Sequence, residues 1–126
     1  WKSKIMSVKK VPEGEFIGYG YNFQADQEMQ IATVPVGYSD GYSRQLSNNG
    51  HVLVRETRAD VIGTVNMNMV LVNTTHIPDL KIGEEVVLLG SQGESEISVA
   101  SFLEMNNSMN YELLSRLPES IERVVV

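Results

Sequence analysis

Tyrosines next to glycines are the residues of this chain best suited to chemistry. Gly18-Tyr19-Gly20 sets a phenol between two residues without side chains, and Gly37-Tyr38-Ser39-Asp40-Gly41-Tyr42 sets two more beside a turn. Asn110-Tyr111-Glu112 closes a predicted helical segment. A phenol donates or accepts a hydrogen bond, and it acts as a base when its pKa falls below the usual value of about 10. Glycines let a ligand approach closely, but tyrosines in such places also serve simply as packing in a β-domain.

Other kinds of reactive site find little support. His51 and His76 stand apart, with no second histidine or carboxylate at ligand spacing, so we expect no metal. The chain has no cysteine, which excludes disulfides and thiolate nucleophiles. Motifs for a serine nucleophile, a phosphate-binding loop or a dinucleotide site are absent. A formal net charge of -6 argues against a nucleic-acid surface.

The elements that must position these tyrosines are mostly β. Short apolar runs separated by turn residues predict strands, and Pro35 should confine its strand to an edge or an end. The expected strands are Ile5–Val11, Met29–Val36, His51–Arg55, Val61–Val65, Met69–Val72, Glu85–Leu89 and Glu122–Val126.

Helix is expected only near the end of the chain. Ser98 should cap a helix that carries Val99, Phe102 and Leu103, and a second short helical turn over 111–117 should stop at Pro118. We therefore predict one mainly β domain over residues 1–126, an antiparallel β-barrel-like fold with one or two short helices near the C-terminus. No apolar stretch of about 20 residues and no export signal is present, so we expect a cytoplasmic protein.

Taken together and in order, several segments resemble the C-terminal β-domain of the alanine racemase family. Gly-Tyr-x-Asp-Gly is characteristic of that family, and residues 62–68 occupy the place of its Gly-x-x-Cys-Met-Asp stretch. The matching segments are residues 8–14, 18–20, 35–42, 62–68, 83–90 and 110–113.

The resemblance implies a racemase that uses pyridoxal 5'-phosphate (PLP), bound to a lysine of a separate TIM-barrel domain of the same protein. Proton removal on one face of the substrate Cα and delivery on the other would invert L- and D-alanine. Tyr19 matches the catalytic tyrosine, which the partner subunit of a homodimer supplies. Tyr38 and Met67 match substrate-binding positions for the carboxylate, Met67 through its backbone, and Tyr111 matches a cofactor-binding phenol at the PLP phosphate. The implied role is D-alanine supply for the cell wall.

Some residues depart from the family pattern. Asn68 stands where the family usually has aspartate, which removes a charge but keeps the hydrogen-bonding groups. None of the lysines matches the PLP lysine, so we expect the isolated chain to be inactive. The alternatives are a serine- or lysine-type racemase domain, including the cytoplasmic domain of a membrane-anchored racemase, or a non-catalytic β-barrel binding module.

Overall fold

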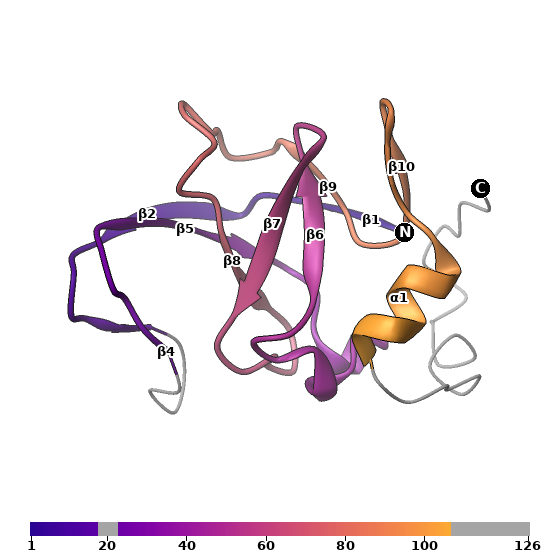
Figure 1. The fold of residues 1–126 in the computed structure, drawn as a ribbon, viewed down its shortest axis with the longest axis horizontal. Helices are drawn as coiled ribbons and strands as arrows, with labels where there is room; N and C mark the ends of the chain where they lie inside the picture. Colours follow the sequence, from indigo (N-terminus) through magenta and orange to yellow (C-terminus); the bar gives the residue numbers. More distant parts are fainter. Residues whose placement is uncertain (18–22, 107–126) are drawn as a thin grey trace.

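A curled antiparallel sheet dominates the computed structural model, which describes residues 1–17 and 23–106 (Figure 1). Its seven strands lie in the order β1-β9-β6-β7-β8-β5-β2, and every neighbouring pair is antiparallel. These strands are β1 (Lys2–Lys4), β2 (Ser7–Val11), β5 (Met29–Val34), β6 (His51–Val54), β7 (Thr57–Ile62), β8 (Val70–Asn73) and β9 (Glu85–Val87). The prediction of a mainly β, barrel-like antiparallel domain is confirmed.

The curl arises because the first strand changes partner. β1 and β2 stand at opposite ends of the strand order, yet only Ile5 and Met6 separate them in the sequence. The Ile5 N–H donates to the carbonyl of Glu84 beside β9, whereas the Met6 N–H donates to the carbonyl of Thr33 in β5 (2.9 and 2.8 Å). One segment therefore joins both ends of the sheet. The single predicted strand Ile5–Val11 was wrong at this point, because Ile5 lies in the break.

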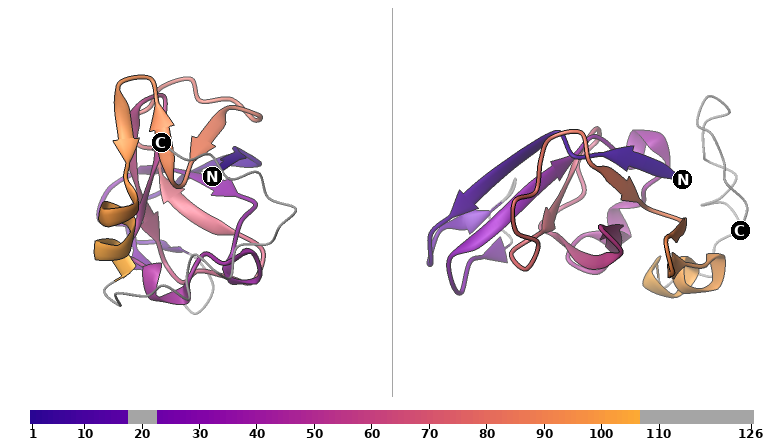
Figure 2. Two further views of the ribbon diagram at one scale, coloured as in Figure 1. Left: turned by 90° about the vertical axis from the view of Figure 1, so that its right-hand side faces the viewer. Right: turned by 90° about the horizontal axis from the view of Figure 1, so that it is seen from above.

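Smaller elements make up the rest of the secondary structure in the described residues. Two hairpins pair β3 (Phe16–Ile17) with β4 (Phe23–Gln24), and β10 (Gly90–Gln92) with β11 (Ser95–Ile97). The 3-10 turns η1 (Tyr38–Asp40) and η2 (Arg44–Leu46) follow β5. Helix α1 (Val99–Asn106) lies near one end of the long axis and β4 near the other (Figures 1 and 2). The predicted second helical turn over 111–117 and the predicted strand Glu122–Val126 lie outside the described residues.

Alternation along the strands creates two apolar clusters. In β5, Ala32 and Val34 face the large cluster inside the curl, whereas Met29 and Ile31 face a smaller cluster. The β3–β4 hairpin covers that smaller cluster through Ile17, with Phe23 packed against it. The sheet is thus apolar on both faces where the hairpin crosses it.

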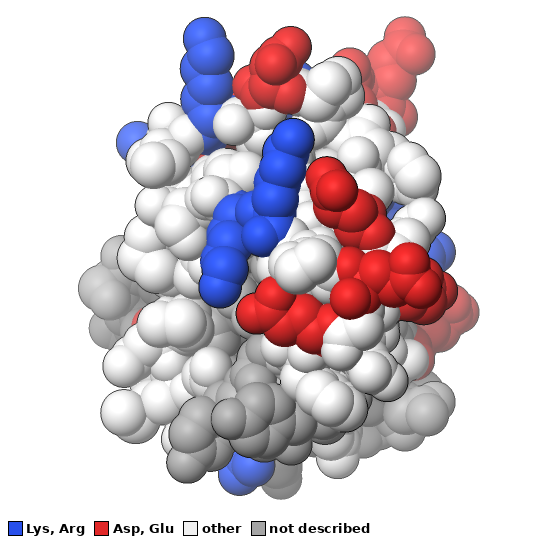
Figure 3. Space-filling model, turned by 90° about the vertical axis from the view of Figure 1, so that its left-hand side faces the viewer, with Lys and Arg blue, Asp and Glu red and all other residues white. Residues whose placement is uncertain are grey.

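Helix α1 begins as predicted. The Ser98 hydroxyl accepts a hydrogen bond from the N–H of Ser101, and Phe102 is buried on the inner face of the helix. Val99, expected on the same apolar face, is instead 48% exposed. Among the described residues no helix has the length and apolar character needed to cross a bilayer. The face beside β2 and β4 carries acidic and basic side chains next to each other rather than one sign of charge (Figure 3).

Candidate functional site

Two loops that carry predicted site residues lie against each other at one end of the neighbouring strands β5 and β8. Val34, the last residue of β5, pairs with Val70, the first residue of β8. The segment leaving β5 and the segment entering β8 therefore start side by side. The Tyr38 N–H donates to the carbonyl of Asn66 (3.0 Å), and the Ser39 N–H donates to the carbonyl of Met67 (3.1 Å). We call residues 37–41 and 66–69 the loop pair.

Gly37 permits this close approach. A Cβ placed on Gly37 would lie 2.1 Å from the Asn66 carbonyl oxygen and 2.5 Å from that of Met67. Both atoms belong to the backbone, so neither can move aside without displacing its loop. The Gly37 N–H donates to the Asp40 carboxylate (3.1 Å), which closes η1 on itself. Glycine is therefore required here for space rather than for an unusual backbone angle.

The loop pair presents three large side chains to the outside, those of Tyr38, Met67 and Met69. Tyr38 is 45% exposed and Met67 is 51% exposed. The Arg44 guanidinium lies 5.6 Å from the centre of the Tyr38 ring, within range of a cation–π contact. A hollow of about 270 Å³ beside the ring is lined by Tyr38, Gly41, Ser43 and Arg44. The predicted substrate-binding residues Tyr38 and Met67 are thus brought together, and Arg44, which the motif comparison did not assign, joins them.

The backbone N–H of Met67 is oriented by its neighbours. In a trans peptide the C=O and N–H point in opposite directions. Because the Asn66 carbonyl faces the Tyr38 N–H, the Met67 N–H points away from residues 38–39. Within the described part of the chain it donates to no protein acceptor. An amide N–H with no acceptor among the described residues, an exposed phenol and a guanidinium are each donors that suit an anionic group such as a carboxylate.

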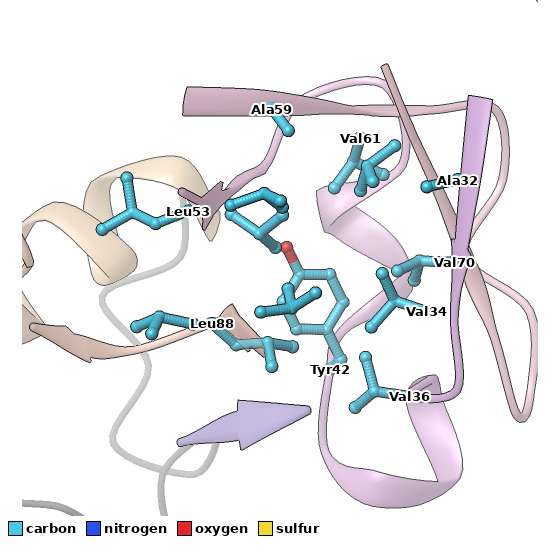
Figure 4. Packing of buried hydrophobic residues seen from close by; sticks show 14 of the residues in the cluster. Ala32, Val34, Val36, Tyr42, Leu53, Ala59, Val61, Val70 and Leu88 are labelled. Carbon is cyan, nitrogen blue, oxygen red and sulfur yellow. The ribbon is translucent and has the colours of Figure 1, made fainter. Parts of the chain in front are cut away.

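Tyr42, in the same motif, differs from Tyr38 in its surroundings. Its side chain is fully buried, and its hydroxyl points into the large apolar cluster (Figure 4). Trp1 and Phe102 contact its ring edge-on, at centroid distances of 6.1 and 6.0 Å. Burial raises the pKa of the Tyr42 phenol well above its usual value. Tyr42 is therefore a packing residue and not a base.

Two predicted site residues lie outside the described residues. Tyr19 falls in the segment 18–22, between β3 and β4, and Tyr111 falls in the segment that follows α1. Their assignments as the catalytic and cofactor-binding tyrosines stay predictions.

The described histidines, carboxylates and lysines are the side chains that could hold a metal ion or PLP. Among the described residues no three His, Asp or Glu side chains gather to hold a metal ion. His51 is half-buried, and its pKa is lowered, first by burial and then by nearby Arg58. All the lysines of the chain are exposed, and Lys2 pairs with Glu85 at 3.4 Å. A lysine that carries PLP needs an enclosed pocket, so the described residues do not fit as a PLP site on their own.

Known proteins similar to this chain agree with the motif comparison. The family model of the alanine racemase C-terminal domain matches residues 1–125. An alanine racemase of Halothermothrix orenii is 42% identical over 98% of the chain, and one of Syntrophobacter fumaroxidans is 46% identical over 90%. The chain spans about a third of the length of these relatives (32% and 30%).

Solved structures give the same result. The alanine racemase of E. faecalis superposes with a TM-score of 0.86 at 31% identity, over 95% of this chain and 32% of that one. The alanine racemase of Bartonella henselae with covalently bound pyridoxal phosphate has a TM-score of 0.88 over 99% of this chain and 34% of that one. At 23% identity it supports the fold alone. The chain therefore belongs to the alanine racemase family, as its C-terminal domain.

Proposed function

We propose that this chain is the C-terminal domain of a PLP-dependent racemase that interconverts L- and D-alanine by proton transfer at Cα. The loop pair carries the proposal, because it brings the segments of Tyr38 and Met67 together beside Arg44, and each of these residues offers a donor suited to a substrate carboxylate. Membership of a family whose relatives are named alanine racemase supports the choice of substrate.

Each residue has a distinct part in this proposal. The Tyr38 hydroxyl and the Met67 N–H would hold the carboxylate, which fixes the direction of the Cα–H bond. The phenol of Tyr19, supplied by the partner subunit of a homodimer, would take or return the Cα proton on one face. Tyr111 would hydrogen-bond the phosphate of PLP. The cofactor and the base on the opposite face would belong to a TIM-barrel domain outside this chain.

The proposal has consequences for the isolated domain. Because the described residues do not form a PLP site, this chain alone would be inactive. The complete protein would act in the cytoplasm and supply D-alanine for the cell wall. The length of the relatives, about three times that of this chain, supports the need for a further domain.

The test replaces the C-terminal domain of the E. faecalis racemase with this chain and measures exchange of the Cα hydrogen of L- and D-alanine in D2O. We expect exchange with both enantiomers. Tyr19→Phe should suppress exchange of one enantiomer far more than the other, because only one face loses its base. Tyr21→Phe, two residues away, is the matched control and should leave that ratio unchanged.

The same assay separates the alternatives. If the assembled protein binds PLP but Tyr19→Phe and the parent exchange both enantiomers equally, the tyrosine assignment is wrong. A domain that restores no exchange at all with any amino acid favours a non-catalytic binding module, to which Asn68 in place of the family's aspartate would also point. Exchange of serine or lysine in preference to alanine indicates the corresponding racemase type.

A further inference from the structure

Ser39 makes two contacts across the loop pair that the backbone alone does not provide. Its hydroxyl lies 2.6 Å from the carbonyl oxygen of Met67 and 3.3 Å from Oδ1 of Asn68. Its own N–H reaches the same Met67 carbonyl at 3.1 Å. The Met67 carbonyl thus accepts two donors from a single residue, whereas the Asn66 carbonyl accepts one, the Tyr38 N–H.

These contacts control two successive peptide planes. Tyr38 N–H fixes the plane between Asn66 and Met67, which carries the Met67 N–H. Ser39 fixes the next plane through the Met67 carbonyl. With the peptide planes on both sides of Met67 held, rotation about its backbone bonds would break at least one of these hydrogen bonds. The bonds therefore keep the Met67 N–H in one direction. The Asn66 N–H to Met69 carbonyl bond (3.0 Å) closes the turn behind it.

Asn68 is chemically suited to support this arrangement. A serine hydroxyl has one proton to donate and can also accept. If the proton goes to the Met67 carbonyl, the Ser39 oxygen needs a donor. A half-turn of the Asn68 amide brings its NH₂ group to that position, whereas an aspartate could only compete for the proton.

We propose that Ser39, backed by the amide of Asn68, is a positioning residue that sets the direction of the Met67 N–H. The inference rests on the proposed function for its kinetic consequence, because Met67 matters there as a contact for the substrate carboxylate. It assigns a use to the Asn68 amide, at a position where this chain departs from the family pattern. Ser39 itself touches no reacting atom in this scheme.

The experiment uses the assembled racemase described above and two measurements. Ser39→Ala should speed hydrogen–deuterium exchange of the amides of Tyr38, Ser39 and Asn66, and raise KM for alanine about two- to fivefold with little change in kcat. Ser39→Thr keeps the hydroxyl and should restore both values. Ser95→Ala is the matched control, because it removes a hydroxyl-to-carbonyl bond of similar length (2.9 Å, to Glu56) in the β10–β11 hairpin, and it should change neither.

A double-mutant cycle tests the part played by Asn68. Asn68→Asp should weaken the bond from the Ser39 hydroxyl to the Met67 carbonyl, because the carboxylate competes for the same proton. The double variant should be no worse than Ser39→Ala, which has no hydroxyl left to redirect. Additive effects on KM would overturn the pairing with Asn68, and unchanged amide exchange in Ser39→Ala would overturn the positioning role. Faster exchange with unchanged KM would support the positioning role and contradict the proposed carboxylate contact of Met67.

Discussion

The loop pair and the aromatic cluster around Tyr42 are built from the same motif in opposite ways. Tyr38 is 45% exposed and is held by hydrogen bonds of its backbone, while Tyr42, four residues later, is fully buried and is held by Trp1 and Phe102. Because backbone hydrogen bonds hold Tyr38, its side chain can stay exposed to a ligand. Tyr42 is held by the packing of its ring, which buries its hydroxyl among apolar side chains. An exposed phenol and a buried, structural phenol therefore lie four residues apart in one motif, and they differ in the contacts that hold them in place.

Phe102→Ala should have the largest effect, because it removes the packing behind Tyr42. Phe102 is 1% exposed, so its truncation should lower the free energy of unfolding by about 3–5 kcal/mol in chemical denaturation. Val99→Ala, on the same helix but 48% exposed, is the control and should change stability by about 0.5 kcal/mol or less. A small loss of stability in Phe102→Ala would mean that the packing of Phe102 against Tyr42 contributes little to the free energy of unfolding.

Gly37→Ala should be the next most severe change, and it acts on the loop pair. The added methyl group overlaps two backbone oxygens, so the loops must separate, at a cost of about 1–3 kcal/mol. The Ser39 amide should then exchange its hydrogen faster. Gly14→Ala adds a methyl group with no atom within 4 Å, where only the positive φ of +87° causes strain. It should leave Ser39 exchange unchanged, and equal exchange in both variants would contradict close approach at Gly37.

Much of the sheet could be predicted from the sequence because apolar alternation reports burial directly. β5 ends at Val34, immediately before Pro35, as expected for a residue without an N–H. β7 was placed wrongly at Val61–Val65. It begins at Thr57 and ends at Ile62. Its start was missed because Thr57, Arg58 and Asp60 are polar and exposed, and its end was overrun because Gly63 takes a φ of +73°. The hairpin β10–β11 was missed, since three-residue strands carry almost no periodic signal.

The candidate site was predictable only in part. Motif resemblance identified Tyr38 and Met67, and the loop pair does bring them together. Residue chemistry alone could not separate Tyr38 from Tyr42, because both follow a glycine near a turn and burial depends on contacts with Trp1 and Phe102 far away in the sequence. Ser39 and Arg44 carry no recognisable pattern, and their roles depend on distances across the fold.

Alkaline pH should lower the stability of the folded chain, because the Tyr42 phenol is buried. The pKa of Tyr42 is raised in the folded chain by burial, so the folded state holds its proton more tightly than the unfolded state. This contribution to stability is fully present below the unfolded pKa of about 10 and is lost as pH rises above it, by at most about 1.4 kcal/mol per pH unit. Denaturation at a series of pH values from 8 upward measures this slope. Tyr42→Phe should make the slope shallower, and an identical slope would place the titration elsewhere.

Tyr42→Phe should have the smallest effect at neutral pH, and its sign is the informative result. Among the described residues the Tyr42 hydroxyl has no hydrogen-bond partner, and burying a polar group in this state costs free energy. Removing it should leave stability unchanged or raise it by about 1 kcal/mol, as measured by chemical denaturation, with Tyr38→Phe near zero as the exposed counterpart. A loss of more than about 1 kcal/mol would show that the hydroxyl is bonded in solution, for example to an enclosed water molecule. The two tyrosines would then differ in exposure but not in their need for a polar partner.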